Sequence, residues 1–146
     1  MFKKILVALD GSVASSNALK VALELAQIAS ANIELLTIVP PVLLPQYSIY
    51  VLKSDAISEY AKQLEISFRG VLSKAQEEAR KRKPSFNITT RFEKGDPAEK
   101  IVEVAERGNF DLIGMGSRGL SSKFSNIGSV SSKVVDKANC PVFIVK

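Results

Sequence analysis

Residues 111–119 read Asp-Leu-Ile-Gly-Met-Gly-Ser-Arg-Gly, and residues 128–131 read Gly-Ser-Val-Ser. An apolar run precedes the glycines and a helical pattern follows them, which predicts a strand, a loop and the start of a helix. Glycines let a backbone approach a ligand closely, and the free N–H groups of a helix start favour an anion. This stretch is therefore predicted to bind phosphate.

The rest of the chain repeats the alternation of strand and helix. The continuously apolar run 5–9 is typical of a central strand, whereas 87–92 alternates polar and apolar residues and is expected at a sheet edge. This order predicts an α/β fold: a Rossmann-like, doubly wound parallel sheet of five strands with helices on both faces. The predicted strands are residues 5–9, 33–39, 87–92, 111–115 and 142–145.

Two helices are expected between the first three strands. The first follows the turn 10–12 and is predicted to bury an apolar stripe made of Ala18, Val21, Ala22, Leu25, Ile28 and Ala29. The second is long, begins at residues 54–55, ends before Pro84 and carries apolar residues at helical spacing throughout. Residues 40–53, with three prolines, are expected to form a long loop that acts as a lid or a contact surface.

The third helix has a strong start signal. Asp96 is a predicted N-cap, Pro97 takes the first helical position, and Glu99 follows at the third. A last helix is expected from about Val130. No linker or repeat interrupts the alternation, so residues 1–146 are predicted to form a single domain.

The composition excludes several classes of protein. Of the 146 residues, 46% are hydrophobic and 24% are charged, which is a globular composition. The chain has no histidine, so Ser-His and Cys-His nucleophile pairs and histidine zinc sites are absent. Cys140 is the only cysteine and is expected to be a buried apolar group. No apolar run approaches the ~20 residues of a membrane span, so no membrane partner is expected.

The net charge of +5 is concentrated in the run Arg80–Lys83. Cations at the end of a helix are favourable because of the helix dipole. No aromatic residues interleave with the run, so no nucleic-acid partner is expected. The apolar segment 5–9 is too short for a signal peptide and is followed by an acidic residue, which predicts a cytoplasmic protein.

Asp10 is expected to face the glycines. Ligands of open α/β sheets bind beyond the carboxyl ends of the strands, where the strand order reverses. If residues 5–9 form the central strand, Asp10 lies across that crevice from Met115 and Gly116. A carboxylate there suits a ribose hydroxyl or a divalent cation, and its alternative role is to cap the first helix.

Two other α/β families fit the residues less well. Gly114, Gly116 and Gly119 match the dinucleotide fingerprint, but the next strand, 142–145, carries no carboxylate, which that motif requires. A receiver domain needs an acidic cluster after its first strand, where this chain has Asp10 alone. A Walker-type Gly-Lys-Ser/Thr is also absent.

Five blocks, in this order, resemble the universal stress protein family: residues 5–12, 95–101, 111–120, 128–131 and 140–142. The resemblance spans nearly the whole chain. It implies the strand order 3-2-1-4-5, a homodimer and, in one branch of the family, an ATP site marked by Gly-x2-Gly-x9-Gly-Ser/Thr. This chain has one residue fewer between the second and third glycines of that pattern.

The resemblance also implies roles for individual residues. The glycines would turn at the phosphates, and Ile38 would meet adenine through its backbone. The implied cofactors are ATP and Mg²⁺, with Asp10 on the ribose or metal side. The implied nucleotide-binding residues are Ala8, Leu9, Asp10, Ile38, Met115, Gly116, Arg118, Gly119, Gly128, Ser129, Val130 and Ser131.

The expected function is that of an ATP-binding signalling or protective module in a stress response, with an unknown protein partner. The family implies a homodimer through residues 141–146, and such pairing would cover an apolar edge strand. Two alternatives stay open: a nucleotide-free interaction protein of the same fold, and a slow ATP hydrolase or phosphotransferase. Asp10 is the only candidate general base, so no catalytic residue is assigned.

Overall fold

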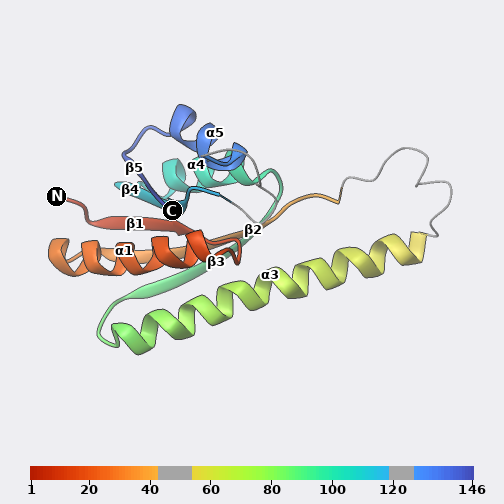
Figure 1. Cartoon of the computed structure of the whole chain (residues 1–146), viewed down its shortest axis with the longest axis horizontal. Helices are drawn as coiled ribbons and strands as arrows, with labels where there is room; N and C mark the ends of the chain where they lie inside the picture. Colours follow the sequence, from red (N-terminus) through yellow and green to blue (C-terminus); the bar gives the residue numbers. More distant parts are fainter. Residues whose placement is uncertain (43–53, 119–126) are drawn as a thin grey trace.

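Five parallel strands form one sheet in the order β3-β2-β1-β4-β5 (Figure 1). The computed structural model describes residues 1–42, 54–118 and 127–146. The expected strand order is confirmed, and the expected bounds differ from the observed ones by one or two residues at most. The strands are β1 (Lys4–Ala8), β2 (Asn32–Val39), β3 (Ile88–Lys94), β4 (Leu112–Gly116) and β5 (Val142–Val145).

Helices cover both faces of the sheet, each over its own hydrophobic core (Figure 1). On one face lie α1 (Val13–Ala29) and α3 (Ser54–Arg82). On the other face lie α4 (Pro97–Arg107) and α5 (Ser129–Lys137). The prediction of a doubly wound α/β fold is therefore confirmed.

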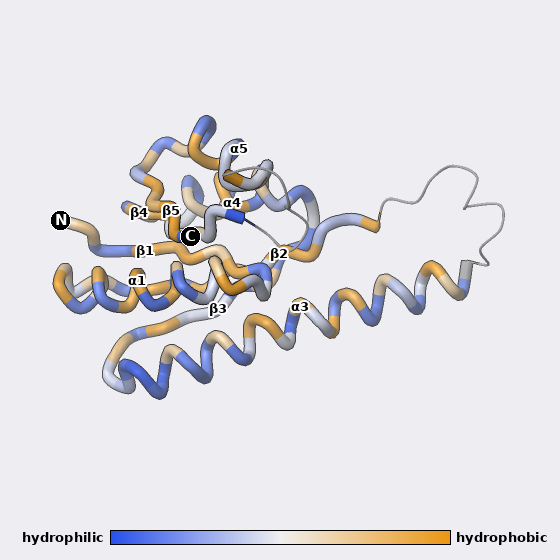
Figure 2. Tube along the Cα trace, viewed as in Figure 1, coloured by the Kyte–Doolittle hydropathy of each residue, from blue (hydrophilic) through white to orange (hydrophobic). Residues whose placement is uncertain are grey.

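The central position of β1 explains its composition. Ile5, Leu6 and Val7 are fully buried, since Ile5 and Val7 face the α1/α3 core and Leu6 faces the α4/α5 core. Figure 2 shows this apolar stretch as orange along β1. At the sheet edge, β3 buries Ile88 and exposes Thr89 on its solvent side, which confirms its expected place.

Side chains cap two of the helices that lead into the functional edge of the sheet. Ser12 caps α1 by accepting a hydrogen bond from the Ser15 N–H at 3.1 Å, so Asp10 is not the cap. Asp96 caps α4 as expected, accepting from the Glu99 N–H at 3.1 Å. In contrast, α5 begins at Gly128 without a capping side chain.

Two expectations about buried helix faces are wrong in part. On α1 the expected Ala18 and Ala22 are buried, but Ile28 is 76% exposed, because the buried stripe is shifted toward Leu19, Leu23 and Ala26. Apolar residues occur on both sides of this helix, so its sequence period alone does not select the buried side. On α3 the buried residues among those described are Leu72, Ala75 and Ala79, which all lie in the second half of the helix.

The first half of α3 extends beyond the sheet (Figure 1). Tyr60 and Ile66 are 57% and 62% exposed there. Most of the loop expected at residues 40–53 lies outside the described residues. Within the described residues, no helix is both long enough and apolar enough to cross a membrane.

The basic run ends α3 as expected from helix-dipole electrostatics. Arg80, Lys81 and Arg82 occupy the last turn. Lys81 pairs with Glu77 at 3.1 Å and Arg82 with Glu78 at 3.5 Å, both one turn earlier on the helix. The local charge of this run is thus partly balanced within α3 itself.

Candidate functional site

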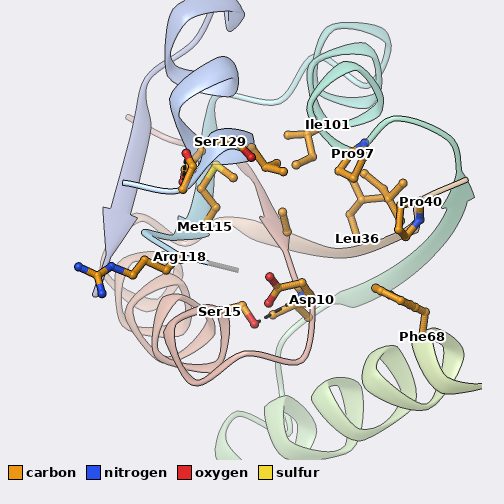
Figure 3. Close-up of a pocket in the computed structure, with 17 residues that line it drawn as sticks. Asp10, Ser15, Leu36, Pro40, Phe68, Pro97, Ile101, Met115, Arg118 and Ser129 are labelled. Atoms are coloured by element: carbon orange, nitrogen blue, oxygen red, sulfur yellow. Dashed lines mark hydrogen bonds between the residues drawn. The ribbon is translucent and has the colours of Figure 1, made fainter. Parts of the chain in front are cut away.

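A cavity of about 230 Å³ opens at the carboxyl ends of the strands (Figure 3). It lies around the end of β1, whose neighbours β2 and β4 continue the sheet in opposite directions. Ligands of open α/β sheets bind in this crevice. Its walls are Ala8, Leu9, Asp10, Ser15, Leu36, Ile38, Pro40, Phe68, Pro97, Ile101, Met115, Gly116, Arg118, Gly128, Ser129, Val130 and Ser131.

The start of α5 forms one end of the cavity. Gly128 is the N-cap, with φ −66° and ψ 161°, and no side chain caps the helix. The first N–H groups of a helix have no acceptor within the helix, and they carry the positive end of its dipole. Arg118 adds an exposed cation to the cavity wall. This end of the cavity therefore favours an anion.

Ser117 holds the start of α5 against the sheet. Its carbonyl oxygen accepts hydrogen bonds from the Gly128 N–H and from the Ser131 hydroxyl, the latter at 3.1 Å. Its N–H donates to the Val145 carbonyl at 2.7 Å. Ser131 is buried, and its hydroxyl also lies 3.3 Å from the Gly128 carbonyl. The Ser131 side chain thus positions the helix start, while its neighbours face the cavity.

Asp10 stands at the end of β1 with one carboxylate oxygen engaged. Its Oδ1 accepts from the Ser12 N–H at 2.9 Å, across Gly11, whose φ of +87° strongly favours glycine. Oδ2 accepts no hydrogen bond from the described residues and is available to a ligand. Within the described part of the chain, no three metal-binding side chains gather. A cation here would need other ligands, such as phosphate oxygens.

The other end of the cavity is apolar. Ile38 of β2 and Ile101 of α4 are buried in the α4/α5 core and reach this end of the cavity wall; Met115 of β4, from the same core, also lines the cavity. Pro40, Pro97 and Phe68 lie toward this end in Figure 3, away from Arg118. A pocket with an apolar end and an anion-favouring end suits a ligand with the same division.

Gly116 is required by packing at the cavity floor. A Cβ atom at this position would lie 2.7 Å from the Ser15 backbone nitrogen and 2.8 Å from the Ala14 carbonyl carbon. The end of β4 therefore approaches the start of α1 more closely than any other residue type permits. This glycine lets the end of β4, which carries Met115, lie against the start of α1, which follows the turn with Asp10.

The structure brings the predicted site residues together. Eleven of the twelve line this one cavity, and the twelfth, Gly119, lies outside the described residues. The residues that sequence reasoning missed are Ser15, Leu36, Pro40, Phe68, Pro97 and Ile101. Leu36 follows from the period of two on β2, since it shares a face with Ile38. Phe68 has no such signal, because its place depends on how α3 packs.

A second cavity, of about 380 Å³, lies between the ends of α4 and α5. Among the described residues, its wall has a single charged side chain, Glu106, whose carboxylate accepts from the Asn139 amide at 2.6 Å. Cys140 also lines it and is only partly buried, which corrects the expectation of a buried residue, and partial burial raises the pKa of its thiol. The thiol is therefore protonated at neutral pH, as expected for an unreactive cysteine.

The whole chain, residues 1–146, matches the universal stress protein family. Universal stress protein YxiE of Bacillus subtilis is 33% identical over 150 aligned positions that cover 100% of both chains. The structure of UspA from Lactobacillus plantarum superposes with a TM-score of 0.75 at 26% identity, covering 99% and 98% of the two chains. The structure of an Archaeoglobus fulgidus universal stress protein in complex with dAMP superposes with a TM-score of 0.66 at 21% identity, covering 100% of this chain and 98% of the other. This likeness shows a shared fold.

The family match and the full-length relatives agree with the observed strand order and with the cavity at the end of β1. The chain belongs to the universal stress protein family.

Proposed function

We propose that this protein binds ATP and acts in the cytoplasm as a dimeric, nucleotide-dependent signalling or protective module of a stress response. The observation that carries the proposal is the two-ended cavity at the carboxyl edge of the sheet. A nucleotide has a flat aromatic base, whose faces pack against apolar side chains, at one end and anionic phosphates at the other. The cavity offers Ile38 and Met115 to the first and the uncapped start of α5 to the second.

The proposed nucleotide contacts follow this division. Adenine lies against Ile38, Ala8 and Met115, and the phosphates lie near Gly116, Arg118 and the helix start at Gly128, Ser129 and Val130. Leu9 forms the part of the wall next to Asp10. Gly119 is included in the proposed site because of its place in the glycine pattern of the sequence. Asp10 Oδ2 takes a ribose hydroxyl or Mg²⁺. Mg²⁺ typically binds one or two carboxylates together with phosphate oxygens, which one aspartate suits.

Support from relatives is limited to what they share with this chain. The Archaeoglobus protein is in complex with dAMP and has the same fold. At 21% identity, this likeness supports the fold of the present chain and not its ligand. The nucleotide assignment therefore rests on the cavity of this chain. Hydrolysis ranks lower than binding, because Asp10 is the only carboxylate that the described residues bring to the cavity wall, and its Oδ1 already accepts from the Ser12 N–H.

The proposed dimer uses residues 141–146. All four residues of β5 are half-buried in the single chain, and β5 is the edge strand next to β4. Apolar edge strands are hazards unless they are covered, and a second copy in antiparallel pairing would cover this one. The nucleotide-free alternative also uses this dimer, so oligomeric state alone does not distinguish the two functions.

The site is tested by adding a negative charge where phosphate is expected. Ser129→Asp puts a carboxylate in the first turn of α5, which stabilises the helix through its dipole but repels phosphate. Ser132→Asp is the matched control, since Ser132 is exposed on the same helix and outside the cavity wall. Calorimetric titration with ATP and Mg²⁺ is expected to show affinity at least ~10-fold weaker for Ser129→Asp and nearly unchanged for Ser132→Asp.

Two results would count against the proposal. Failure of the unmutated protein to bind ATP at millimolar concentration would remove the ATP assignment and favour the nucleotide-free interaction protein. Equal binding by both aspartate variants would place the phosphates elsewhere.

A further inference from the structure

Phe68 is the contribution of α3 to the cavity wall. It lies in the middle of the helix, and no phosphate-binding motif includes it. Figure 3 shows its side chain extending from α3 on the side of Pro40 and Asp10, far from Arg118. Phe68 therefore belongs to the apolar end of the cavity.

The ring of Phe68 does not serve as core packing. It is half-buried, yet among the described residues it belongs to neither hydrophobic core nor to the side chains packed against them. Val71, nearly one turn later on α3, and Phe92 of β3 do pack against the α1/α3 core. A large aromatic side chain half-buried beside a cavity, without core contacts, is available to a ligand.

Contacts on both sides hold this turn of α3 in place. Glu65 pairs with Lys94 at the end of β3 at 2.8 Å and with Arg69 at 3.1 Å. The Arg69 guanidinium lies 4.0 Å from the centre of the Phe92 ring. These contacts join the middle of α3 to β3 on either side of Phe68 in the sequence, which positions the Phe68 ring relative to the sheet.

The Gly11 turn supports the same placement from the other side. A Cβ on Gly11 would lie 3.0 Å from Val71 Cγ2, which shows how closely α3 approaches the turn that carries Asp10. Phe68 thus stands next to the proposed ribose and metal side of the site. The base of a nucleotide bound there would lie within the apolar end that Phe68 borders.

We propose that Phe68 is a specificity-determining residue, whose ring contacts the heteroaromatic base of the bound nucleotide. This inference rests on the proposed nucleotide-binding function and adds a contact that the glycine motif does not supply. Aromatic rings interact with bases through their faces, in addition to excluding water from them. An aromatic residue at position 68 therefore favours nucleotides over sugar phosphates that lack a base.

The test compares ATP affinity among four proteins by calorimetric titration. Phe68→Leu keeps the apolar character but removes the ring, and we expect about fivefold weaker binding. Phe68→Tyr keeps the ring, and affinity is expected within about twofold of the unmutated protein. Tyr60→Ala is the matched control on the same helix, since Tyr60 is 57% exposed and outside the cavity wall, and it is expected to change nothing.

The outcomes separate this inference from the proposed function. ATP binding that is unchanged in Phe68→Leu overturns the role of Phe68 and leaves the proposed function standing. An equal loss in Phe68→Leu and Phe68→Tyr also overturns it, because the position would then require the shape of phenylalanine for packing. Absence of ATP binding by the unmutated protein overturns both.

Discussion

Gly116→Ala is expected to destabilise the fold, although it adds one methyl group. The new Cβ would lie 2.7 Å from Ser15 N and 2.8 Å from both the carbonyl carbon and the Cβ of Ala14. Favourable contacts between heavy atoms lie at about 3.5–4.0 Å, so β4 and the start of α1 must separate by nearly 1 Å. Two of the three obstructing atoms are backbone, which cannot rotate away.

The cost follows from overpacking in a close-packed interior, typically about 1–3 kcal/mol. A backbone obstruction places Gly116→Ala at the upper end, about 2–3 kcal/mol. For a chain of this size, each kcal/mol changes Tm by roughly 2–4 °C, so a fall of about 5–10 °C is expected. Urea unfolding monitored by circular dichroism gives the free energy, and a thermal scan gives Tm.

Gly70→Ala is the matched control. Gly70 lies inside α3, and a Cβ there meets no atom within 4 Å. Alanine is favoured over glycine in a helix by about 0.5–1 kcal/mol, so this variant should be slightly more stable than the parent. If Gly116→Ala were as stable as Gly70→Ala, the close approach of β4 and α1 would be refuted. The result also affects the interpretation of ATP-binding experiments on Gly116 variants. If such a variant is destabilised, a loss of ATP affinity cannot be assigned to the binding site alone.

Three further predictions concern single side chains. Asp10→Asn keeps an Oδ1 acceptor for the Ser12 N–H, so Tm should be unchanged. In calorimetry, the increase in ATP affinity on adding Mg²⁺ should be lost, and an increase equal to that of the parent would exclude Asp10 as a metal ligand. Thr37→Val should raise the free energy of unfolding by about 1 kcal/mol, because the Thr37 hydroxyl is fully buried and has no partner among the described residues; a destabilised variant would contradict this. The Asp111 carboxylate accepts from the backbone N–H groups of Lys3 and Lys4 at 2.7 and 2.9 Å, which lowers its pKa. Its contribution is therefore present above the unfolded pKa and lost below about pH 4, so the stability gap between the parent and Asp111→Asn should close as acid is added.

Local sequence was sufficient for most of the fold. The continuous apolar run at β1 and the alternating run at β3 report how many faces of each strand are covered, which is a property of strand position in a sheet. The start of α4 at Asp96 could be read directly, because a cap depends on the residues adjacent to it. The glycines at the end of β4 and at the start of α5 indicated the cavity for the same reason.

Burial along the helices was harder to read. Ile28 has the spacing of a buried residue and is exposed, since α1 carries apolar residues on more than one side. The apolar stripe of α3 continues past the point where the helix leaves the sheet, and nothing in its period marks that point. Which side of a helix is buried depends on how the helix is oriented against its neighbours in the fold. The spacing of apolar residues in the sequence does not specify that orientation.

The residue pattern alone thus established the α/β order and the family resemblance, because these depend on short-range spacing, and the resemblance in turn implied eleven residues of one cavity wall. Only the tertiary structure showed that Gly116 is required by the start of α1, that Ser131 holds α5 to Ser117, and that Phe68 enters the cavity from α3. Each of these contacts joins elements far apart in the chain. Their geometry follows from how helices pack on the sheet, which no local stretch of sequence specifies.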